Sequence, residues 1–422
     1  MAQVIAVLFL TFFLFEFLVE LVLNELNISH VRCHRSVQGA TRLLHDRIGP
    51  EQVDQSVAYS LAKNRFQRWA AIYGAVATLV VLFGGVLPFL DTLSRTVGKS
   101  FPSGQEATGI LFCLGTGLVV SVLNLPVDLY SIFVIERRFG FNRTTPGLFI
   151  SDKLKALFLG VLFGGPFLFA VLWLMRATGP AWWIWAFFFI FAFQLFMLLA
   201  YPALIAPLFN RFTPLETGEI SERIASLAER AGLKTGGIFT MDGSKRSAHS
   251  NAYFTGVGRT KRIVLFDTLL KQLNTEQLLA VLAHEMGHYK MKHIRRTLLV
   301  RGVFLLAGLF VLSRLVDYQP LYLAFGLAEP SRHGALVLFA FMAGPLTFYL
   351  TPFFNHLSRK HEYEADGFAA RLLNNGKALG EALVELTVQN LSNLTPHPWY
   401  SAYHYSHPTT DERIRAMGLE KP

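Results

Sequence analysis

The chain has 422 residues, of which 52% are hydrophobic and only 16% are charged, with a formal net charge of +10. That much apolar surface exceeds what one soluble core of this size buries, so a lipid bilayer is the expected solvent for the rest. The two cysteines, Cys33 and Cys113, are too few for a disulfide framework or a thiolate metal cluster, so any metal must be held by histidines and carboxylates.

Apolar stretches of the length needed to cross a membrane, about 20 residues, recur along the chain. Seven such stretches lie at roughly 3–24, 68–90, 107–134, 156–176, 181–207, 297–318 and 334–357. The first has no basic residue before it and no small-residue cleavage site after it, which is typical of a retained helix rather than a signal peptide. The sequence therefore predicts a mainly α, multi-pass membrane protein with about seven transmembrane helices.

Basic residues are dense in the connections after the first and third spans and sparse in the alternate ones, which carry little beyond Arg95, Lys99 and Arg176. This bias places the side rich in basic residues in the cytoplasm and the N-terminus outside. We therefore expect the positive charge to lie at the surface of a bilayer, and we expect no nucleic-acid partner. Counting crossings then puts both long polar segments on the cytoplasmic face. The expected division of the chain is 1–207 with five spans, 208–296 as the first part of a cytoplasmic domain, 297–358 with two spans, and 359–422 as the second part of that domain.

The 208–296 segment has the pattern of a small α/β unit. A helix around 217–232, an alternating stretch around 237–241 and a β-rich run from Ala252 to Phe266 precede a second helix. Asn274 with Gln277 three residues later is an N-terminal capping signal for that helix.

The second helix contains the sequence HEMGH. His284 and His288 are four residues apart, so both imidazoles leave the same helix face and can bind one ion. Glu285 lies on the neighbouring side, where a carboxylate accepts a proton from a water that zinc activates. The spacing thus predicts a zinc-dependent peptide hydrolase with Glu285 as the general base.

The plain alternative is a helix that carries solvated histidines near a membrane surface. It leaves Gly287 unexplained, because a glycine inside a helix costs about 1 kcal/mol relative to alanine. A close approach by another helix would offset that cost, and such an approach is needed to supply a third ligand.

The best candidate for the third ligand is in HEYEADGFAA, directly after the last span. Glu362 and Asp366 are four residues apart and share a helix face, whereas Glu364 points elsewhere. Glu362 would complete a two-histidine, one-glutamate site with one open position, and Asp366 would orient a ligand histidine. His361 is a rival ligand, and a solvated acidic helix is the non-metal alternative.

Several stretches together resemble the CAAX prenyl protease 1 family of seven-helix membrane zinc endopeptidases. They span nearly the whole chain: ERRFGFNR at 136–143, APLFNRFTPL at 206–215, SAHSNAYF at 247–254, RIVLFDTLL at 262–270, HEMGH, EYEAD and SHPTTDERI at 406–414. The resemblance implies a helical barrel with a zincin-like catalytic domain made from two chain segments, and one Zn²⁺ per chain. It implies His284, His288 and Glu362 as zinc ligands, Glu285 as base and Asp366 as the residue behind them.

The resemblance also implies residues that contact the substrate. Asn251, Ala252, Tyr253 and Phe254 would form an edge strand that pairs with an extended peptide, while His407 and Arg413 would face the reacting bond, His407 as a catalytic residue. On the residues alone, an ordinary buried hairpin and a surface histidine fit these positions equally well.

The short connection at 317–333 and the absence of a di-lysine signal at the C-terminal end favour a bacterial cytoplasmic-membrane member over an endoplasmic reticulum one. The expected partners are the bilayer and a peptide or protein substrate, with lipid-modified and membrane-embedded substrates both left open, and the chain is expected to act as a monomer. Two other functions remain open: a quality-control protease for membrane proteins, and a transporter or channel with a regulatory metal site.

Overall fold

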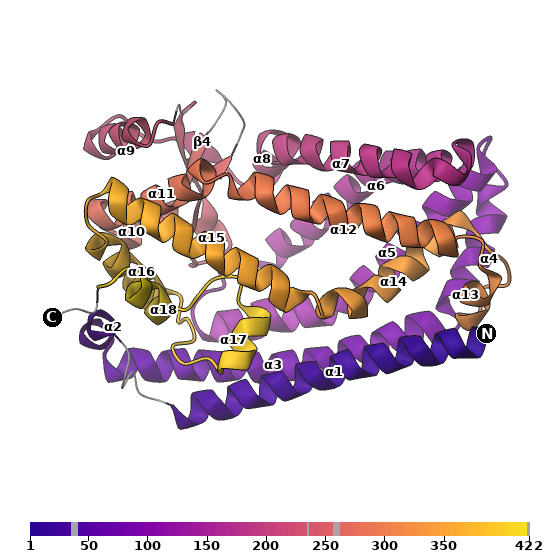
Figure 1. The fold of residues 1–422 in the computed structure, drawn as a ribbon, viewed down its shortest axis with the longest axis horizontal. Coiled ribbons are helices and arrows are strands. Elements are labelled where there is room, and N and C mark those ends of the chain that lie inside the picture. Colours follow the sequence, from indigo (N-terminus) through magenta and orange to yellow (C-terminus); the bar gives the residue numbers. More distant parts are fainter. Residues whose placement is uncertain (35–40, 234–235, 256–261, 420–422) are drawn as a thin grey trace.

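A computed structural model describes residues 1–34, 41–233, 236–255 and 262–419. Its long helices run along the long axis of the molecule (Figure 1). Within the described residues, six helical stretches are long and apolar enough to cross a membrane. Four are single helices: α1 (Ala2–Cys33), α3 (Pro50–Phe83), α6 (Pro146–Ala177) and α12 (His293–Leu315). Another joins α5 (Gly104–Tyr130) to the π-helix η1 (Ser131–Glu136), and the last runs through η2 (Gly179–Ala181), α7 (Trp182–Ala200), η3 (Tyr201–Ile205) and α8 (Ala206–Phe209). The predicted multi-pass membrane protein is confirmed.

The seventh predicted span differs from the prediction because it is broken. α14 (Arg332–Phe348) and α15 (Thr351–Leu372) meet at an angle of 63°. Pro352 lies in the first turn of α15, where it has no N–H to donate to the carbonyl of Phe348 four residues earlier, so α14 cannot continue through it as one regular helix. The membrane helix therefore ends at the bend, and α15 continues as a separate helix that carries Glu362.

Apolar side chains lie on both the outside and the inside of the helical region. Phe158, Phe188 and Val303 are more than half exposed, as expected for side chains that face lipid. Phe112, Tyr322 and Phe325 are fully buried between helices at the end of the molecule where α4 (Val86–Gly98) and α13 (Gln319–Ala324) lie. Both helices connect spans at this end, far from α11 in Figure 1.

A small mixed sheet stands at the opposite end of the molecule. Its strands are β1 (Phe212–Pro214), β2 (Ile238–Met241), β3 (Ala252–Thr255) and β4 (Arg262–Phe266), in the order β1-β2-β4-β3. β2 and β4 are parallel, and the other two pairs are antiparallel. β3 is thus an edge strand. The helices and the 3-10 turn around the sheet are α9 (Glu219–Arg230), η4 (Gly243–Lys245), α10 (Asp267–Gln272) and α11 (Thr275–Lys290).

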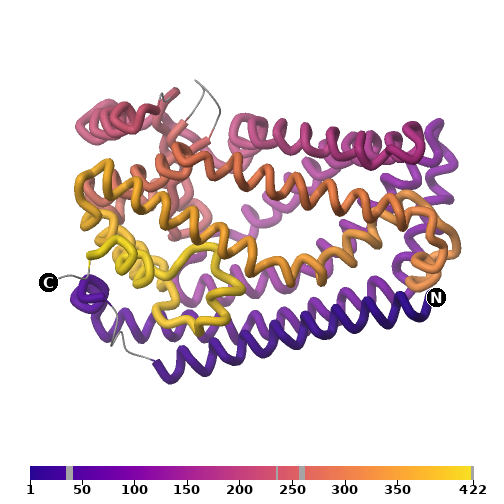
Figure 2. The backbone as a smooth tube through the Cα atoms, viewed as in Figure 1, coloured from indigo at the N-terminus to yellow at the C-terminus, as the bar shows by residue number. Residues whose placement is uncertain are grey.

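The C-terminal segment packs against these elements. α15 and α16 (Lys377–Gln389) lie against α11, and their residues share a core with the sheet that includes Leu282 and Leu383. α18 (Thr410–Ala416) and α16 also meet α2 (Arg42–Arg47) through Leu44, Val384 and Ile414. Figure 2 shows the yellow C-terminal segment beside the indigo early helices. In this segment α17 (Pro398–His404) contacts both α15 and α1. Segments far apart in sequence thus surround α11.

Candidate metal centre

α11 is a well-capped helix that presents the HEMGH residues. Asn274 Oδ1 accepts a hydrogen bond from Gln277 N at 3.0 Å, and Gln277 Oε1 accepts one from Asn274 N at 3.1 Å. The predicted capping box is confirmed. These bonds satisfy two otherwise unpaired amides at the helix start and fix the helix on which His284 and His288 are placed.

Gly287 lets α15 approach α11 closely. A Cβ atom at this position would lie 3.0 Å from Ala365 Cα and 3.1 Å from Ala365 O. Both distances are shorter than an unstrained carbon contact allows, so any larger residue would push the helices apart. The predicted close approach at Gly287 is confirmed, and it brings Glu362 to the histidines.

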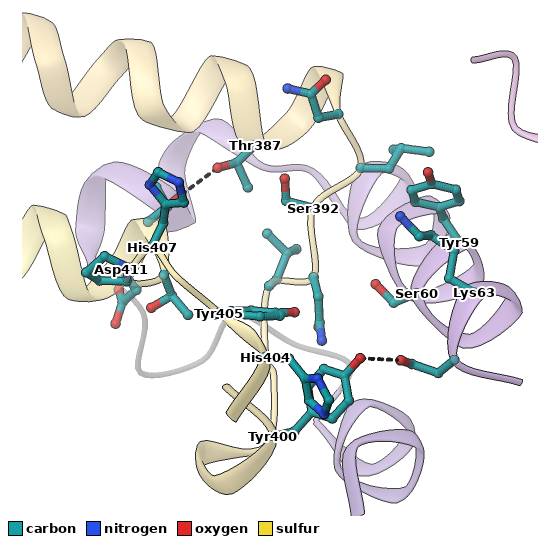
Figure 3. A pocket seen from close by; sticks show the side chains of 18 of the residues that line it. Tyr59, Ser60, Lys63, Thr387, Ser392, Tyr400, His404, Tyr405, His407 and Asp411 are labelled. Carbon is teal, nitrogen blue, oxygen red and sulfur yellow. Dashed lines mark hydrogen bonds between the residues drawn. The ribbon is translucent and has the colours of Figure 1, made fainter. Parts of the chain in front are cut away.

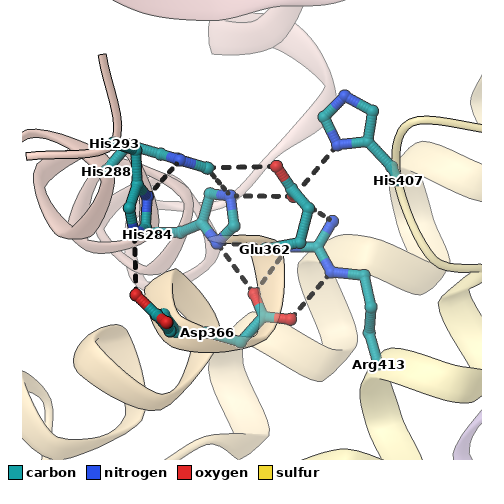
Figure 4. A network of polar contacts seen from close by, with 8 residues as sticks. His284, His288, His293, Glu362, Asp366, His407 and Arg413 are labelled. Carbon is teal, nitrogen blue, oxygen red and sulfur yellow. Dashed lines mark hydrogen bonds and ion pairs between the residues drawn. The ribbon is translucent and has the colours of Figure 1, made fainter. Parts of the chain in front are cut away.

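Three candidate ligands converge from the two helices (Figure 4). His284, His288 and Glu362 each offer one ligand atom, and these atoms lie within 4.8 Å of one another. His284 Nε2 is 3.1 Å from His288 Nε2, and the Glu362 carboxylate lies 3.4 Å from the first nitrogen and 3.2 Å from the second. Two imidazoles and a carboxylate are a donor set that zinc favours.

The orientation of His284 follows from its other ring nitrogen. Asp366 Oδ1 lies 2.7 Å from His284 Nδ1, and because a carboxylate only accepts, Nδ1 carries the proton. Nε2 therefore faces the cluster. The bond fits the role predicted for Asp366, because it fixes the ring in the orientation that a metal ligand needs.

His288 is oriented by a pair of residues that the sequence analysis did not select. Its Nδ1 lies 3.0 Å from Nδ1 of His293, whose Nε2 lies 3.0 Å from Glu364 Oε2. Since Glu364 accepts from His293 Nε2, His293 Nδ1 is left to accept from His288 Nδ1, and His288 Nε2 faces the cluster. His293 is the first residue of the helix that follows HEMGH. A histidine five residues after His288 was the one feature of the sequence that could have indicated this support.

His361, the rival ligand, lies outside this cluster. Its ring stacks on that of His293, with centroids 4.1 Å apart at 11°. Among the described residues only His284, His288 and Glu362 form a group of three donors close enough to hold one metal ion. The geometry thus favours Glu362 over His361.

The electrostatics of the cluster favour a cation between the three side chains. Burial alone would raise the pKa of Glu362, but its contacts with His284 and His288 hold that pKa well below its usual range. Burial likewise opposes the charged form of His284, yet its bonds to Asp366 and Glu362 raise its pKa to about 9. In addition, Glu362 Oε2 is buried and accepts no well-directed hydrogen bond. The residues therefore fit a divalent metal.

Glu285 stands beside this group, one residue after His284. Burial raises the pKa of its carboxyl group, and the neighbouring histidines oppose that rise. A carboxylate with a raised pKa is a stronger base, which suits a group that takes and returns a proton near neutral pH.

His407 and Arg413 come from the C-terminal segment and reach the cluster from its other side. His407 Nδ1 is 3.0 Å from Glu362 Oε2, and its side chain is 65% exposed. Arg413 is buried. It donates from Nε and Nη2 to Asp366 at 2.9 and 2.6 Å, its Nη2 is 3.2 Å from His284 Nδ1, and its Nη1 is 3.7 Å from Glu362 Oε2. It therefore braces Asp366, and its contact with a substrate stays a prediction.

A pocket of about 460 Å³ adjoins His407 (Figure 3). It lies between α3 and the C-terminal segment, and its lining includes Tyr59, Lys63, Tyr400 and His407. None of the three candidate ligands lines it. The pocket therefore flanks the metal centre, and His407 belongs to its lining while contacting Glu362.

The expected substrate strand is present as an edge. Ala252, Tyr253 and Phe254 belong to β3, while Asn251 precedes it and accepts a hydrogen bond from Phe266 N at 3.0 Å through its carbonyl oxygen. β3 pairs with β4 on one side and packs on α11. No other described strand pairs with β3, so its second edge has backbone groups available for an extended chain.

The loop with the sequence ERRFGFNR, residues 136–143, contacts the segment that leads into β3. Asn142 forms an isolated β-bridge with Ser247, and Arg246 donates to both carboxylate oxygens of Asp152 at 2.8 and 3.0 Å. His249 stacks on Phe141 with centroids 4.1 Å apart. The loop after the third span therefore positions the edge strand, a role that the sequence analysis did not assign.

Comparisons with known proteins agree along the whole chain. Residues 27–211 match the family model of the CAAX prenyl protease N-terminal region with five membrane helices, and residues 214–420 match peptidase family M48. A CAAX prenyl protease 1 homolog of Arabidopsis thaliana is 39% identical over 381 residues, covering 88% of this chain and 89% of the relative. CAAX prenyl protease 1 of Saccharomyces cerevisiae is 37% identical over 410 residues, covering 89% and 87%.

A solved structure has the same fold. The crystal structure of S. mikatae Ste24p superposes with a TM-score of 0.90 at 33% identity and covers 98% of each chain. The relatives named here are eukaryotic, so they give no support to the expected bacterial origin. The alternative of a transporter or channel is displaced by the peptidase match. The chain belongs to the CAAX prenyl protease 1 family of multi-pass membrane zinc metallopeptidases, within peptidase family M48.

Proposed function

We propose that His284, His288 and Glu362 hold the zinc ion of this peptidase and that Glu285 is its general base. The observation that carries the proposal is the convergence of two oriented imidazole nitrogens and a buried carboxylate from helices on either side of two membrane segments. Zinc held there supplies Lewis-acid polarisation to a water molecule and to the scissile carbonyl group.

The chain's own residues carry the proton. Glu285 takes one proton from the attacking water and delivers it to the amine that leaves when the C–N bond breaks. His407, exposed at the rim beside Glu362, donates a hydrogen bond to the carbonyl oxygen as negative charge develops on it. Asp366, with Arg413 behind it, keeps His284 in its ligand orientation throughout.

The peptide lies along β3. An extended substrate adds a strand to the free edge at Asn251–Phe254, so that backbone hydrogen bonds give affinity without demanding a particular side chain. Because β3 packs on α11, this placement carries the peptide across the face of the HEMGH helix.

The substrate class is a membrane-associated protein with a prenylated C-terminus. Relatives that are 37 to 39% identical bear the name CAAX prenyl protease 1, which supports a lipid-modified C-terminal peptide. Clearance of misfolded membrane proteins is the second candidate, because an edge strand accepts many sequences.

We further propose that the catalytic segments 208–296 and 359–422 face the cytoplasm, linked by the membrane parts 1–207 and 297–358. The basic connections after the first and third spans support this orientation. In a eukaryotic cell the membrane would be that of the endoplasmic reticulum. All candidate ligands come from one chain, so a monomer suffices.

The test is Glu285→Gln in the full chain. It should retain one zinc per chain and lose about 10²- to 10⁴-fold in cleavage of a reporter peptide, because the amide accepts no proton. Glu276→Gln is the matched control, since Glu276 is an exposed residue on the same helix. Equal turnover by Glu285→Gln and the control would remove Glu285 from this role. Comparing prenylated and unmodified reporter peptides separates the two substrate classes.

A further inference from the structure

The end of the molecule opposite the metal centre contains a second polar pocket, of about 730 Å³. It is built by the end of α4 and the connection after it, by the last turns of α6, and by the start of α14. The connections at this end carry few basic residues. The fold gathers three of those named above, Arg95, Lys99 and Arg176, around this one pocket, together with Arg332 at the start of α14.

Acidic groups neutralise only part of this charge. Arg176 Nη1 pairs with Glu106 Oε1 at 2.9 Å, and Arg95 Nε donates to Asp91 Oδ2 at 2.7 Å. Among the described residues that line the pocket, Glu106 is the single carboxylate. Lys99 and Arg332 are exposed, and no described carboxylate forms an ion pair with either. Two positive charges at the pocket therefore lack a counter-ion.

Close packing holds the walls of the pocket in place. A Cβ atom at Gly98 would lie only 2.1 Å from Thr108 Oγ1, and one at Gly109 would lie 2.6 Å from Leu172 Cδ1. α4, α5 and α6 therefore meet at van der Waals distance around the pocket. Arg332 is tied to the same wall, because its Nε donates to Met175 O at 3.2 Å. A site whose cations are already placed loses little entropy when an anion binds.

α4 has the character of a helix at a membrane surface. Phe89, Leu93 and Val97 recur every four residues and are 66%, 48% and 42% exposed, so they form an apolar stripe on one face. Arg95 and Lys99 lie on the opposite face and line the pocket. An apolar stripe beside a basic face is the pattern of helices that lie in the headgroup region of a bilayer.

We propose that this pocket binds a phosphate-bearing anion, and that the glycerophosphate headgroup of an anionic membrane phospholipid is the occupant the geometry fits best. Lys99 and Arg332 pair with the phosphate, since charge-assisted bonds from both would neutralise the two free cations. The volume exceeds what an inorganic phosphate needs and suits a headgroup with its glycerol. Because the apolar stripe holds α4 at the membrane surface, a phospholipid whose headgroup occupies the pocket can extend its acyl chains into the bilayer.

The test uses the full chain purified in a mild non-ionic detergent. Lys99→Gln combined with Arg332→Gln removes both free cations. Lys271→Gln combined with Lys377→Gln is the matched control, because it removes two exposed positive charges elsewhere. Native mass spectrometry then follows binding of phosphatidylglycerol, phosphatidylcholine and glycerol 3-phosphate to each protein. Zinc content and peptidase activity verify that all three are folded.

Wild type and control should bind phosphatidylglycerol, and the pocket variant should bind it at least about tenfold more weakly. Phosphatidylglycerol should also raise the melting temperature of wild type and control but not that of the pocket variant. If glycerol 3-phosphate binds wild type as tightly as the lipid and is lost in the variant, the phosphate site stands with a soluble ester as its occupant. Equal lipid binding by all three proteins, or no binding of any phosphate compound, would overturn the proposal.

Discussion

The two ends of the molecule contain the same trio of side chains in different settings. At the metal centre His284 lies 2.7 Å from Asp366, which accepts two bonds from Arg413. At the opposite end His333 lies 2.7 Å from Asp91, which accepts a bond from Arg95. Distances and chemical types are alike, yet only the first trio faces further ligands.

The difference lies in the second nitrogen of each imidazole. His284 Nε2 faces His288 and Glu362, which reach it from α11 and α15. His333 instead packs its ring against Phe112, with centroids 5.0 Å apart. A histidine bonded to an aspartate is therefore a general way to hold a buried imidazole. It becomes a metal ligand only where other donors converge, and the following predictions test this distinction.

The largest effect is expected for Glu362→Gln. Replacing the anionic ligand by an amide should reduce zinc far below one per chain and lower peptide cleavage by about a thousandfold or more, since catalysis depends on the metal. Elemental analysis and a reporter-peptide assay measure both. Glu385→Gln, on the surface of α16, is the control. Full zinc occupancy and cleavage in Glu362→Gln would show that the ligand set is different.

The matched aspartates give the direct comparison. Asp366→Asn should weaken zinc binding about 10- to 100-fold, because His284 loses the acceptor that fixes its ring. Asp91→Asn should leave zinc and cleavage unchanged and lower only the melting temperature. Competition with a zinc-binding dye measures the affinity. Equal losses of zinc in both variants would mean that the two trios do not differ in function.

His293→Phe tests the support of His288. Its loss should weaken zinc binding by up to about tenfold, less than Asp366→Asn, because a bond between neutral imidazoles is weaker than one to a carboxylate. His361→Phe should keep full zinc affinity, since His361 lies outside the ligand group. The reverse order of effects would identify His361 as the ligand.

The smallest change is expected from an added methyl group at each end. Gly287→Ala and Gly98→Ala should each destabilise the chain by about 1–3 kcal/mol, because each Cβ would meet a neighbouring helix. Only Gly287→Ala should also reduce cleavage, since it moves α11 away from Glu362. Gly117→Ala, with open space around it, is the control in thermal melting. Reduced cleavage in Gly98→Ala would contradict the separation of the two ends.

Local rules predicted much of this centre from the sequence. The spacing of His284 and His288, the cap at Asn274 and the space required at Gly287 depend on helix geometry, which neighbouring residues determine. Glu362 was found because it shares a face with Asp366 after a span. These features need no knowledge of distant contacts.

Other features depend on contacts that no local pattern encodes. Arg413 braces Asp366 because α18 packs beside α15, and His293 reaches His288 across the break between α11 and α12. The ion pair between Arg246 and Asp152 likewise joins residues that are far apart in the sequence. The bend between Phe348 and Thr351 is a different case, because it lies inside an apolar run in which hydropathy alone suggested one straight span, although Pro352 was a local signal for the break.

The placement of Glu362 beyond the bend limits how the enzyme can be dissected. His284 and His288 precede α12, whereas Glu362 follows α14, so two passages through lipid separate donors that must meet at one point. No contiguous fragment that omits those passages contains all three donors. With the proposed ligand set, a water-soluble truncation that omits those passages would lack an assembled metal centre.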